Sequence, residues 1–439
     1  MTSIAILGSG MAGMGASHRL KQEGLPAVVY DMKDHYGGHT TSYVDASGFV
    51  FDEGPHISFT KDARIQQLFA DNVNGEYEVV HANVNNYWKG SWIKHPAQCN
   101  LRGLPTDFTV KMLTGIIEAH YTESPPATNY EEWLIASFGR PFAETFPMQY
   151  GRKYHTTEAS NMSIDWLGPR LYKPSLEEVL AGSLSASTSD VHYISDFRYP
   201  TRGGFVSFLR PFLDGVDLRL NHRLVYLDPR SRTLRFADGV QVGYDHVISS
   251  IPLPELIRVI DQAPLDVVEA AERLACSTCV IVNVGIDRSD ISDWHWTYFY
   301  DDDFCFSRIS FPHMLSPNNA PPGTGSIQCE LYFSSKYKPL DCEPEACIPR
   351  AIADLKRCGI VRETDRVLFS SVLVAKYANV IFDLERAGAL RVVHGYLDEI
   401  GVRYCGRYGE WGYQWTDEAF KSGESAAQQV LDAPLMARG

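Results

Sequence analysis

One glycine pattern near the N-terminus constrains the fold of this chain more than any other feature. It stands between an apolar run typical of a buried strand and an amphipathic segment typical of a helix, and consists of Gly8, Gly10 and Gly13. A second predicted strand, residues 27–30, ends at Asp31, 18 positions after the third glycine. A glycine triplet alone is weak evidence. A strand, a helix and an acidic residue in this order form the dinucleotide-binding fingerprint.

Each residue of the fingerprint has an expected physical role. Gly8 permits the tight turn, Gly10 lets a pyrophosphate approach the backbone, and Gly13 allows the helix to pack closely on the strand. The N-terminus of the helix supplies partial positive charge, and Asp31 would accept hydrogen bonds from the adenosine ribose. We therefore expect an α/β fold that contains a Rossmann-type nucleotide-binding domain.

The composition limits what else the chain can do. Its 439 residues are 44% hydrophobic, which allows a large core divided into two or three units. A net charge of −14 argues against general affinity for nucleic acid or anionic membranes. No apolar run reaches the length of a transmembrane helix, and the apolar N-terminal stretch contains the glycine pattern, so we predict neither a membrane span nor a signal peptide.

The cysteines indicate a compartment and predict no metal site. Nine scattered cysteines are typical of a protein from a reducing compartment, so we expect a cytoplasmic location. Cys276 and Cys279 form a single CxxC pair with no second pair nearby, and a β-branched run follows them. We interpret this pair as part of a strand rather than as a metal or redox site.

A second glycine pair distinguishes between the possible dinucleotides. Gly37 and Gly38 lie in the stretch YDMKDHYGGHTTS, shortly after Asp31, where a plain NAD site needs no such pair. The stretch resembles the extension found in flavin enzymes of the glutathione-reductase type, in which the second glycine pair lines the FAD pyrophosphate. This resemblance implies FAD as the cofactor and places His39 beside it.

The same resemblance assigns the C-terminal GRYGEW stretch to the cofactor, since the chain of such flavoproteins returns at its end to close over the flavin. We expect Gly406 and Arg407 to end a strand beneath the flavin. Residues 411–417 should then run along the flavin and its ribityl chain, with Trp415 and Thr416 in contact with the cofactor. A helix is expected to begin at Glu418.

Further patterns suggest how the rest of the chain is divided. Strands are predicted at Arg219–Tyr226, Leu234–Phe236 and His246–Ser250, and the first of these lies beside the adenine in related flavoproteins, which places Val225 at the cofactor. Residues 106–199 have mainly helical patterns, and residues 256–389 contain several strands. We predict a discontinuous FAD-binding domain of residues 1–105, 200–255 and 390–439, a helical domain of residues 106–199, and a mixed β-sheet substrate domain of residues 256–389.

Over nearly its whole length the chain resembles the flavoprotein family that contains UDP-galactopyranose mutase, with protoporphyrinogen-oxidase-like and amine-oxidase-like relatives. The resemblance rests on the GRYGEW tail and on stretches at Gly37–Phe59, Trp92–Pro105, Tyr150–Arg170, Tyr199–Phe205, Phe306–Gly323 and Phe382–Leu390. The segments that contain Arg170 and Arg308, and the LER stretch near residue 385, are more specifically similar to the mutase branch.

The resemblance implies a flavin-dependent mutase that interconverts the pyranose and furanose forms of a nucleotide sugar. In that family N5 of the reduced flavin attacks the anomeric carbon, so an electron donor such as NAD(P)H or a reductase must keep the flavin reduced. By motif position, Arg170 and Arg308 match the diphosphate-clamping arginines, and His56 matches the flavin-side histidine. These three are the predicted catalytic residues. Tyr377, Asn379 and Tyr413 are predicted to contact the substrate as well.

Two departures from the family leave a second function open. Gly412 stands where the mutases carry a further arginine, and Tyr154 stands where the family often has tryptophan. Losing one charge-assisted contact would weaken substrate binding by about 1.5–3 kcal/mol. The alternative is an FAD-dependent oxidoreductase that takes hydride from an amine or alcohol carbon or desaturates a ring, and the aromatic segment at residues 293–300 favours it. A flavin-stabilised binding protein is less favoured, because aromatic-rich segments suggest a lined cavity.

Overall fold

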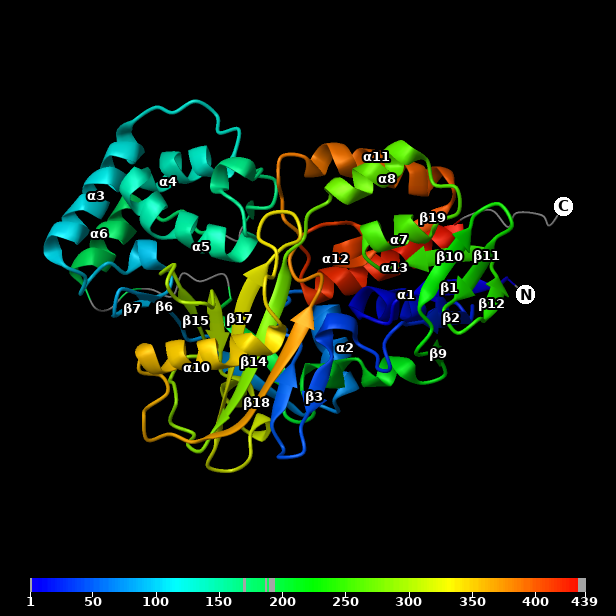
Figure 1. Ribbon diagram of the computed structural model, residues 1–439, viewed down its shortest axis with the longest axis horizontal. Coiled ribbons are helices and arrows are strands. Elements are labelled where there is room, and N and C mark those ends of the chain that lie inside the picture. The colour runs from blue at the N-terminus through cyan, green and yellow to red at the C-terminus, as the bar shows by residue number, and fades with distance from the viewer. Residues whose placement is uncertain (1, 169–170, 186–187, 189–193, 433–439) are drawn as a thin grey trace.

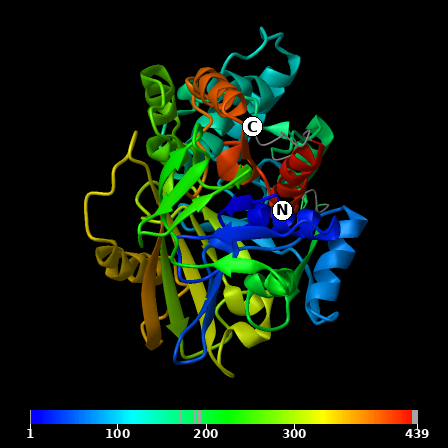
Figure 2. The same ribbon diagram turned by 90° about the vertical axis from the view of Figure 1, so that its right-hand side faces the viewer.

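The computed structural model describes residues 2–168, 171–185, 188 and 194–432 (Figure 1). The chain has an α/β fold built around a parallel sheet and a larger mixed sheet. The parallel sheet has the strand order β19–β13–β1–β2–β9. Its strands are β1 (Ile4–Leu7), β2 (Ala27–Tyr30), β9 (Asp217–Arg219), β13 (His246–Ser249) and β19 (Val402–Tyr404). Figure 2 shows the molecule from the end that carries this sheet.

The nucleotide-binding half of the fold follows the sequence pattern closely. Strand β1 is buried along its whole length and pairs in parallel with both β2 and β13, with Ile4 opposite Ala27 and His246. Helix α1 (Met11–Gln22) follows β1 and leads into β2. The two strands and the helix therefore confirm the strand–helix–strand unit predicted from residues 4–31.

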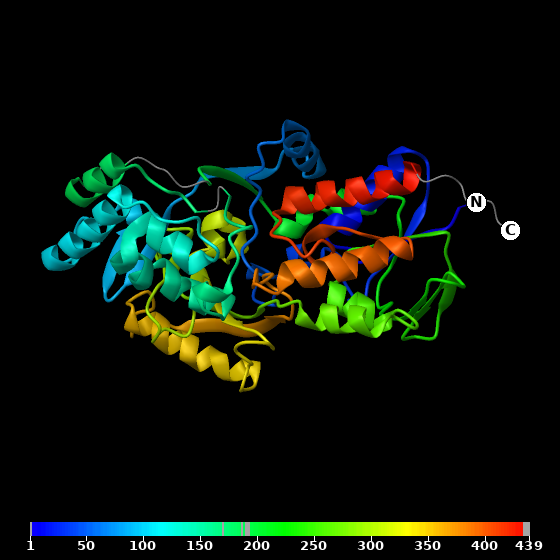
Figure 3. The ribbon, with the colours of Figure 1, turned by 90° about the horizontal axis from the view of Figure 1, so that it is seen from above.

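Helix α13 (Thr416–Asp432) comes from the other end of the chain and packs directly on α1 (Figure 3). Glycines allow this close approach, because a Cβ at Gly15 would lie 2.1 Å from the Phe420 carbonyl oxygen and one at Gly423 would lie 1.9 Å from that of Ala12. The helix begins two residues before the predicted start at Glu418. Its packing ties the C-terminal segment to the nucleotide-binding helix.

The seven-stranded mixed sheet has the order β18–β14–β17–β16–β15–β6–β7. Its strands are β6 (Val84–Trp88), β7 (Ser91–Lys94), β14 (Thr278–Ile286), β15 (Trp296–Phe299), β16 (Arg308–Ser310), β17 (Gly325–Phe333) and β18 (Val367–Ala375). The central strands β14 and β17 are antiparallel and buried, and Cys279 lies on β14. Strands β6 and β7 join this sheet although they belong to the segment 1–105.

A group of helices lies beside one end of the mixed sheet (Figure 1). It comprises α3 (Thr106–Tyr121), α4 (Tyr130–Thr145), α5 (Pro147–His155) and α6 (Leu176–Leu184). Side chains determine where two of these helices begin. Asn129 accepts a hydrogen bond from the Glu132 N–H at the start of α4, and Ser175 and Glu178 form a capping box at the start of α6.

The predicted strand Arg219–Tyr226 is wrong as a single element. The chain leaves β9 at Arg219, Asn221 adopts φ +60°, and a new strand β10 (Leu224–Asp228) begins. A left-handed residue cannot continue an extended strand, so the segment divides. Strand β9 completes the parallel sheet, whereas β10 pairs with β11 (Thr233–Phe236), which pairs with β12 (Gln241–Gly243).

The remaining α-helices and strands connect these parts of the described chain. They are α2 (Ala63–Asn72), α7 (Leu253–Val259), α8 (Leu265–Arg273), α9 (Pro312–Leu315), α10 (Cys347–Arg357), α11 (Arg386–Glu399), α12 (Gly406–Gly409), β3 (Ser42–Val44), β4 (Val50–Asp52), β5 (Tyr77–His81) and β8 (Asp196–Pro200). Helices α7, α8 and α11 pack on the parallel sheet in one core with Leu7 and Val247. Among the described residues, no helix has both the length and the apolarity needed to cross a membrane.

Candidate functional site

The glycine turn after β1 is tightly packed on one side and open on the other. Gly8 has φ +98°, and a Cβ there would lie 2.4 Å from Ser250 Oγ. A Cβ at Gly13 would lie 1.9 Å from the Gly8 carbonyl oxygen, whereas one at Gly10 would meet no atom closer than 3.7 Å. Among the residues that the structure describes, no side chain caps the N-terminus of α1 at Gly10. The first backbone N–H groups of α1 can therefore bind phosphate oxygens, as a dinucleotide site requires.

The second glycine pair lies against the first turn. Gly37 and Gly38 both have positive φ, and Gly37 N–H donates to the Ser9 carbonyl at 3.0 Å. A Cβ at Gly38 would lie 3.1 Å from Gly10 Cα. Two glycine turns that are separate in the sequence thus form one backbone surface. This surface fits a pyrophosphate, because side chains would block the approach of its oxygens to the backbone.

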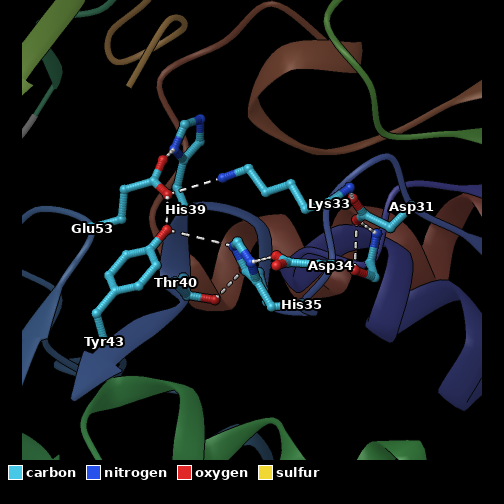
Figure 4. Close-up of polar contacts among 10 residues, drawn as sticks. Asp31, Lys33, Asp34, His35, His39, Thr40, Tyr43 and Glu53 are labelled. Carbon is cyan, nitrogen blue, oxygen red and sulfur yellow. Dashed lines mark hydrogen bonds and ion pairs between the residues drawn. The ribbon is translucent and has the colours of Figure 1, made fainter. Parts of the chain in front are cut away.

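Asp31 lies at the end of β2 and is buried (Figure 4). Its Oδ2 accepts hydrogen bonds from Ser9 N–H at 2.7 Å and from Ser9 Oγ at 2.6 Å, and its Oδ1 accepts one from Lys33 N–H at 2.9 Å. The carboxylate therefore holds the glycine turn in place. Its oxygens keep lone pairs that ribose hydroxyls can share. Sequence reasoning missed Ser9, whose role depends on this contact.

Glu53 organises the loop around His39 (Figure 4). Its buried carboxylate accepts hydrogen bonds from His39 Nδ1 at 2.5 Å, Lys33 Nζ at 2.9 Å and Tyr43 OH at 3.0 Å. Burial alone would raise the pKa of Glu53, but His39 and Lys33 together lower it to about 2. The carboxylate is therefore ionised and holds the His39 ring beside the second glycine turn. Sequence reasoning missed Glu53, because its partners His39, Lys33 and Tyr43 come from an earlier segment of the chain.

His56 is neutral at physiological pH. Burial lowers its pKa to about 4, and the positive charges of His39 and Arg407 act in the same direction. Its Nδ1 lies 2.8 Å from the Gly54 carbonyl oxygen, which can only accept, so Nδ1 carries the proton. Nε2 is consequently an acceptor. The ring packs 5.6 Å from that of Phe205.

Arg308 forms a two-point ion pair that the sequence did not reveal. Its Nε and Nη2 donate to the two carboxylate oxygens of Glu330 at 2.7 and 2.8 Å, and Tyr332 OH donates to Glu330 Oε2 at 2.7 Å. The Arg308 side chain remains 22% exposed, whereas that of Glu330 is 3% exposed. Part of the Arg308 side chain is therefore accessible, while a buried carboxylate fixes the orientation of its guanidinium.

Tyrosines from distant parts of the chain surround Arg308. They are Tyr150 and Tyr154 of α5, Tyr298 of β15, Tyr332 of β17 and Tyr413 of the C-terminal tail. Ring centroids lie 5.4 Å apart for Tyr150 and Tyr154, 5.3 Å for Tyr150 and Tyr298, and 4.7 Å for Tyr154 and Tyr332. We call Arg308, Glu330 and these five tyrosines the arginine–tyrosine cluster. Burial raises the pKa of Tyr150, Tyr154, Tyr298 and Tyr332, so their hydroxyls stay protonated.

Arg407 holds the C-terminal tail in a loop. Its Nε and Nη2 donate to the Gln414 carbonyl oxygen at 3.0 and 2.6 Å, and its guanidinium lies 5.0 Å from the centre of the Tyr413 ring. The expectation that Gly406 and Arg407 end a strand is wrong. Strand β19 ends at Tyr404, and Gly406, with φ +76°, begins the one-turn helix α12.

Tyr377 and Asn379 lie near the tail but form other contacts. Tyr377 OH donates to Glu255 Oε1 at 2.8 Å. Asn379 pairs through its backbone with Ser277, and its Oδ1 accepts from Arg407 Nη1 at 3.4 Å. The structure thus links Asn379 to Arg407 and Tyr377 to helix α7. Their contact with a substrate stays a prediction.

The remaining predicted site residues occupy different surroundings. Arg170 lies outside the described residues. Val225 is exposed on β10, Trp415 packs its ring 4.9 Å from that of Phe59, and Thr416 is the first residue of α13. Gly412 has open space around it, because a Cβ there would meet nothing within 4 Å.

Comparisons with known sequences point to one family. A sequence profile described as flavin containing amine oxidoreductase matches residues 11–431. Phytoene desaturase (lycopene-forming) from Pantoea ananas is 34% identical over 70 residues, which cover 16% of this chain and 14% of the desaturase. The 1-hydroxycarotenoid 3,4-desaturase of Flavobacterium sp. (strain P99-3) is 37% identical over 68 residues, 16% of this chain and 14% of that enzyme. The matched segments thus span about one seventh of these relatives.

Solved structures resemble the chain over its whole length. A crystal structure of reduced UDP-galactopyranose mutase superposes with a TM-score of 0.90 at 24% identity and covers 98% of this chain and 96% of the mutase. Putrescine oxidase bound to putrescine superposes with a TM-score of 0.65 at 15% identity and covers 98% and 99% of the two chains. At these identities the likeness concerns the fold.

Proposed function

The chain belongs to the flavin containing amine oxidoreductase family, and from this premise we propose that it is an FAD-dependent mutase that interconverts the pyranose and furanose forms of a nucleotide sugar. The proposal includes a glutathione-reductase-like FAD-binding domain interrupted by the helices α3–α6. The single observation that carries it is the arginine–tyrosine cluster, which combines a partly exposed arginine side chain with several protonated hydroxyls.

Backbone geometry supports FAD as the cofactor. The two glycine turns form a surface without side chains at the N-terminus of α1, and Asp31 lies at the end of β2 where a ribose would be bound. The pyrophosphate would lie against the backbone of Gly8, Gly10, Gly37 and Gly38, while Gly13 keeps α1 close to β1. His39 and Arg407 would flank the flavin, and Trp415 and Thr416 would follow it toward α13. When bound in its reduced form, the flavin supplies the nitrogen nucleophile for attack on the anomeric carbon.

The cluster suits a diphosphate attached to a sugar. A guanidinium offers paired donors to phosphate oxygens, and tyrosine hydroxyls add neutral donors at fixed positions. Arg308 would bind the diphosphate, with Arg170 as the second predicted clamp. The cluster is too polar for a long hydrocarbon substrate, because each of its buried hydroxyls would need a hydrogen-bond partner.

His56 has a positioning role in this proposal. Its Nδ1–H is committed to the Gly54 carbonyl, so the free Nε2 can accept a hydrogen bond from the flavin side or from a sugar hydroxyl. The lowered pKa keeps this nitrogen unprotonated at neutral pH. A neutral acceptor orients a hydroxyl without adding a charge beside the diphosphate.

The direct test uses the purified protein with its flavin reduced by dithionite. UDP-galactopyranose is added under anaerobic conditions, and the furanose product is sought by chromatography and proton NMR. We expect product only with reduced flavin and no net consumption of reductant, since the isomerisation leaves the redox state unchanged. Activity confined to the oxidised protein, with stoichiometric bleaching of the flavin by substrate, would refute the mutase proposal.

The second candidate is an FAD-dependent oxidoreductase that transfers hydride from a small substrate to the flavin. Three observations favour it. The charge of Arg308 is already matched by Glu330, and the tail has Gly412 where the mutases have an arginine. The local sequence similarity to carotenoid desaturases points the same way. Anaerobic flavin bleaching by a panel of amines, alcohols and cyclic alkanes would identify this activity.

A further inference from the structure

A second polar recess lies beside the arginine–tyrosine cluster. Its volume is about 280 Å³, and it opens among α5, α10, β17 and the loops at residues 302–307 and 338–341. Tyr332 borders both regions, but Arg308, Glu330, Tyr150 and Tyr154 do not line the recess. A recess of this size is at the lower limit of small-molecule sites and suits a compact ligand.

Three cations converge on this recess, namely Lys153, Lys338 and Arg350. Lys153 is buried, with 8% of its surface exposed, and its Nζ donates to the carbonyl oxygens of Asp301 at 2.6 Å and Phe299 at 3.3 Å. Within the part of the chain that the structure describes, no carboxylate lies within ion-pair distance of the Lys153 ammonium. One N–H of this ammonium is consequently left to point at a ligand.

Lys338 and Arg350 are also without ion-pair partners among the residues described. Both side chains are exposed at the recess, and the Lys338 ammonium lies 5.1 Å from the centre of the Phe333 ring. Two carboxylates, Asp302 and Asp341, line the recess too, and Asp302 pairs with Arg152 at 3.6 Å. The cations therefore exceed the anions, in a protein whose overall charge is −14.

We propose that this recess binds a phosphate group, either as the free ion or on a small phosphorylated molecule. Two ammonium groups and one guanidinium line the recess and offer N–H donors to the oxygens of a phosphate dianion. The buried position of Lys153 strengthens its attraction for an anion, because water screens the charge less there. The recess does not include Arg308, Glu330, Tyr150 or Tyr154, so the proposal does not depend on the mutase activity.

The test measures phosphate binding to the flavin-loaded protein by isothermal titration calorimetry at constant ionic strength. Inorganic phosphate and glycerol 3-phosphate are the two probes. We expect saturable binding of at least one probe, and binding about tenfold weaker or more in the Lys338→Ala/Arg350→Ala variant, since that variant loses charge-assisted contacts. Binding of glycerol 3-phosphate alone would identify a phosphorylated molecule as the ligand. Binding of both glycerol 3-phosphate and inorganic phosphate would identify free phosphate as the ligand.

Two control variants distinguish binding in this recess from binding to general surface charge and to the arginine–tyrosine cluster. Arg102→Ala/Lys111→Ala removes the same number of exposed cations elsewhere and should bind the probes as the wild type does. Arg308→Met removes the cation of the arginine–tyrosine cluster, which does not line the recess, so the binding that the Lys338→Ala/Arg350→Ala variant weakens should persist in it. The proposal is overturned if neither probe binds, if the Arg102/Lys111 variant weakens binding as much as the Lys338/Arg350 variant, or if binding is lost only in Arg308→Met.

Discussion

The pairing of Arg308 with Glu330 provides a quantitative test of the arginine–tyrosine cluster. The two residues face each other directly across β16 and β17, and two hydrogen bonds of 2.7 and 2.8 Å join them. Breaking a buried ion pair by removing one partner costs about 3–5 kcal/mol. Because the Arg308 side chain is 22% exposed, water compensates part of this loss. We expect Glu330→Gln to lower the free energy of unfolding by about 2–3 kcal/mol.

Arg308→Met should be more destabilising than Glu330→Gln. It leaves a carboxylate that is 3% exposed with Tyr332 OH as its remaining hydrogen-bond donor, so we expect a loss near the full 3–5 kcal/mol. The double variant removes both charges and should lose less than the sum of the two single changes. A coupling energy of about 2–3 kcal/mol between the two sites follows. Urea unfolding of the wild type, the two single variants and the double variant, followed by circular dichroism, measures this coupling energy.

UDP binding to the same four proteins separates the ion pair from the phosphate clamp. Arg308→Met and the double variant should bind UDP about 10- to 100-fold more weakly, because each lacks a charge-assisted contact to phosphate. Glu330→Gln keeps the Arg308 guanidinium but loses the carboxylate that orients it, so UDP binding should weaken less than in Arg308→Met. Additive stability changes, within about 0.5 kcal/mol, would refute the coupling. Unchanged UDP affinity in Arg308→Met would refute the clamp.

Three other predictions follow from the geometry. Gly13→Ala places a Cβ 1.9 Å from the Gly8 carbonyl oxygen, so it should reduce the amount of bound flavin and lower the free energy of unfolding by about 1–3 kcal/mol. Gly388→Ala is the control, because its Cβ would meet no described atom within 4 Å. It should reduce neither the flavin absorbance nor the urea midpoint. The pKa of His56 is about 4 in the folded protein and about 6.5 in the unfolded chain, so the folded protein favours the neutral ring. The resulting contribution of about 3 kcal/mol to the free energy of unfolding is present above pH 6.5 and is lost as the pH falls toward 4. His56→Gln should flatten the fall in unfolding free energy between pH 7 and pH 4, and an unchanged slope would contradict the assignment. Gly412→Arg adds a Cβ that would meet no described atom within 4 Å, and the new guanidinium should tighten UDP binding about tenfold in calorimetry. No gain in affinity would place residue 412 away from the diphosphate.

Local sequence patterns were sufficient for the nucleotide-binding unit. An apolar run, three spaced glycines and an acidic residue specify β1, α1 and β2, because each element depends on neighbours within about 30 residues. The same reasoning failed at Arg219–Tyr226, where apolar alternation continues through Asn221 although the backbone turns there. The pattern of apolar and polar residues does not predict a single residue with left-handed backbone conformation.

The arginine–tyrosine cluster was only partly predictable. Tyr150 and Tyr154 are four residues apart on α5, so their common face could be read from the helical repeat. Glu330 could not be found in this way, because its pairing with Arg308 depends on the register of β16 and β17, which the loop between them does not determine. The tail brings Tyr413 to the same place only because α13 packs on α1.

The sequence by itself determined the family-level features of this protein: a dinucleotide-binding turn, a second glycine pair and a C-terminal segment that returns to them. These features depend on backbone conformations that only glycine adopts easily, so they are visible in the residue types. The tertiary structure alone decided which charges meet. Strand register and helix packing act between segments far apart in the chain. They bring together Glu330 with Arg308, Glu53 with His39, and Lys153 with Lys338 and Arg350.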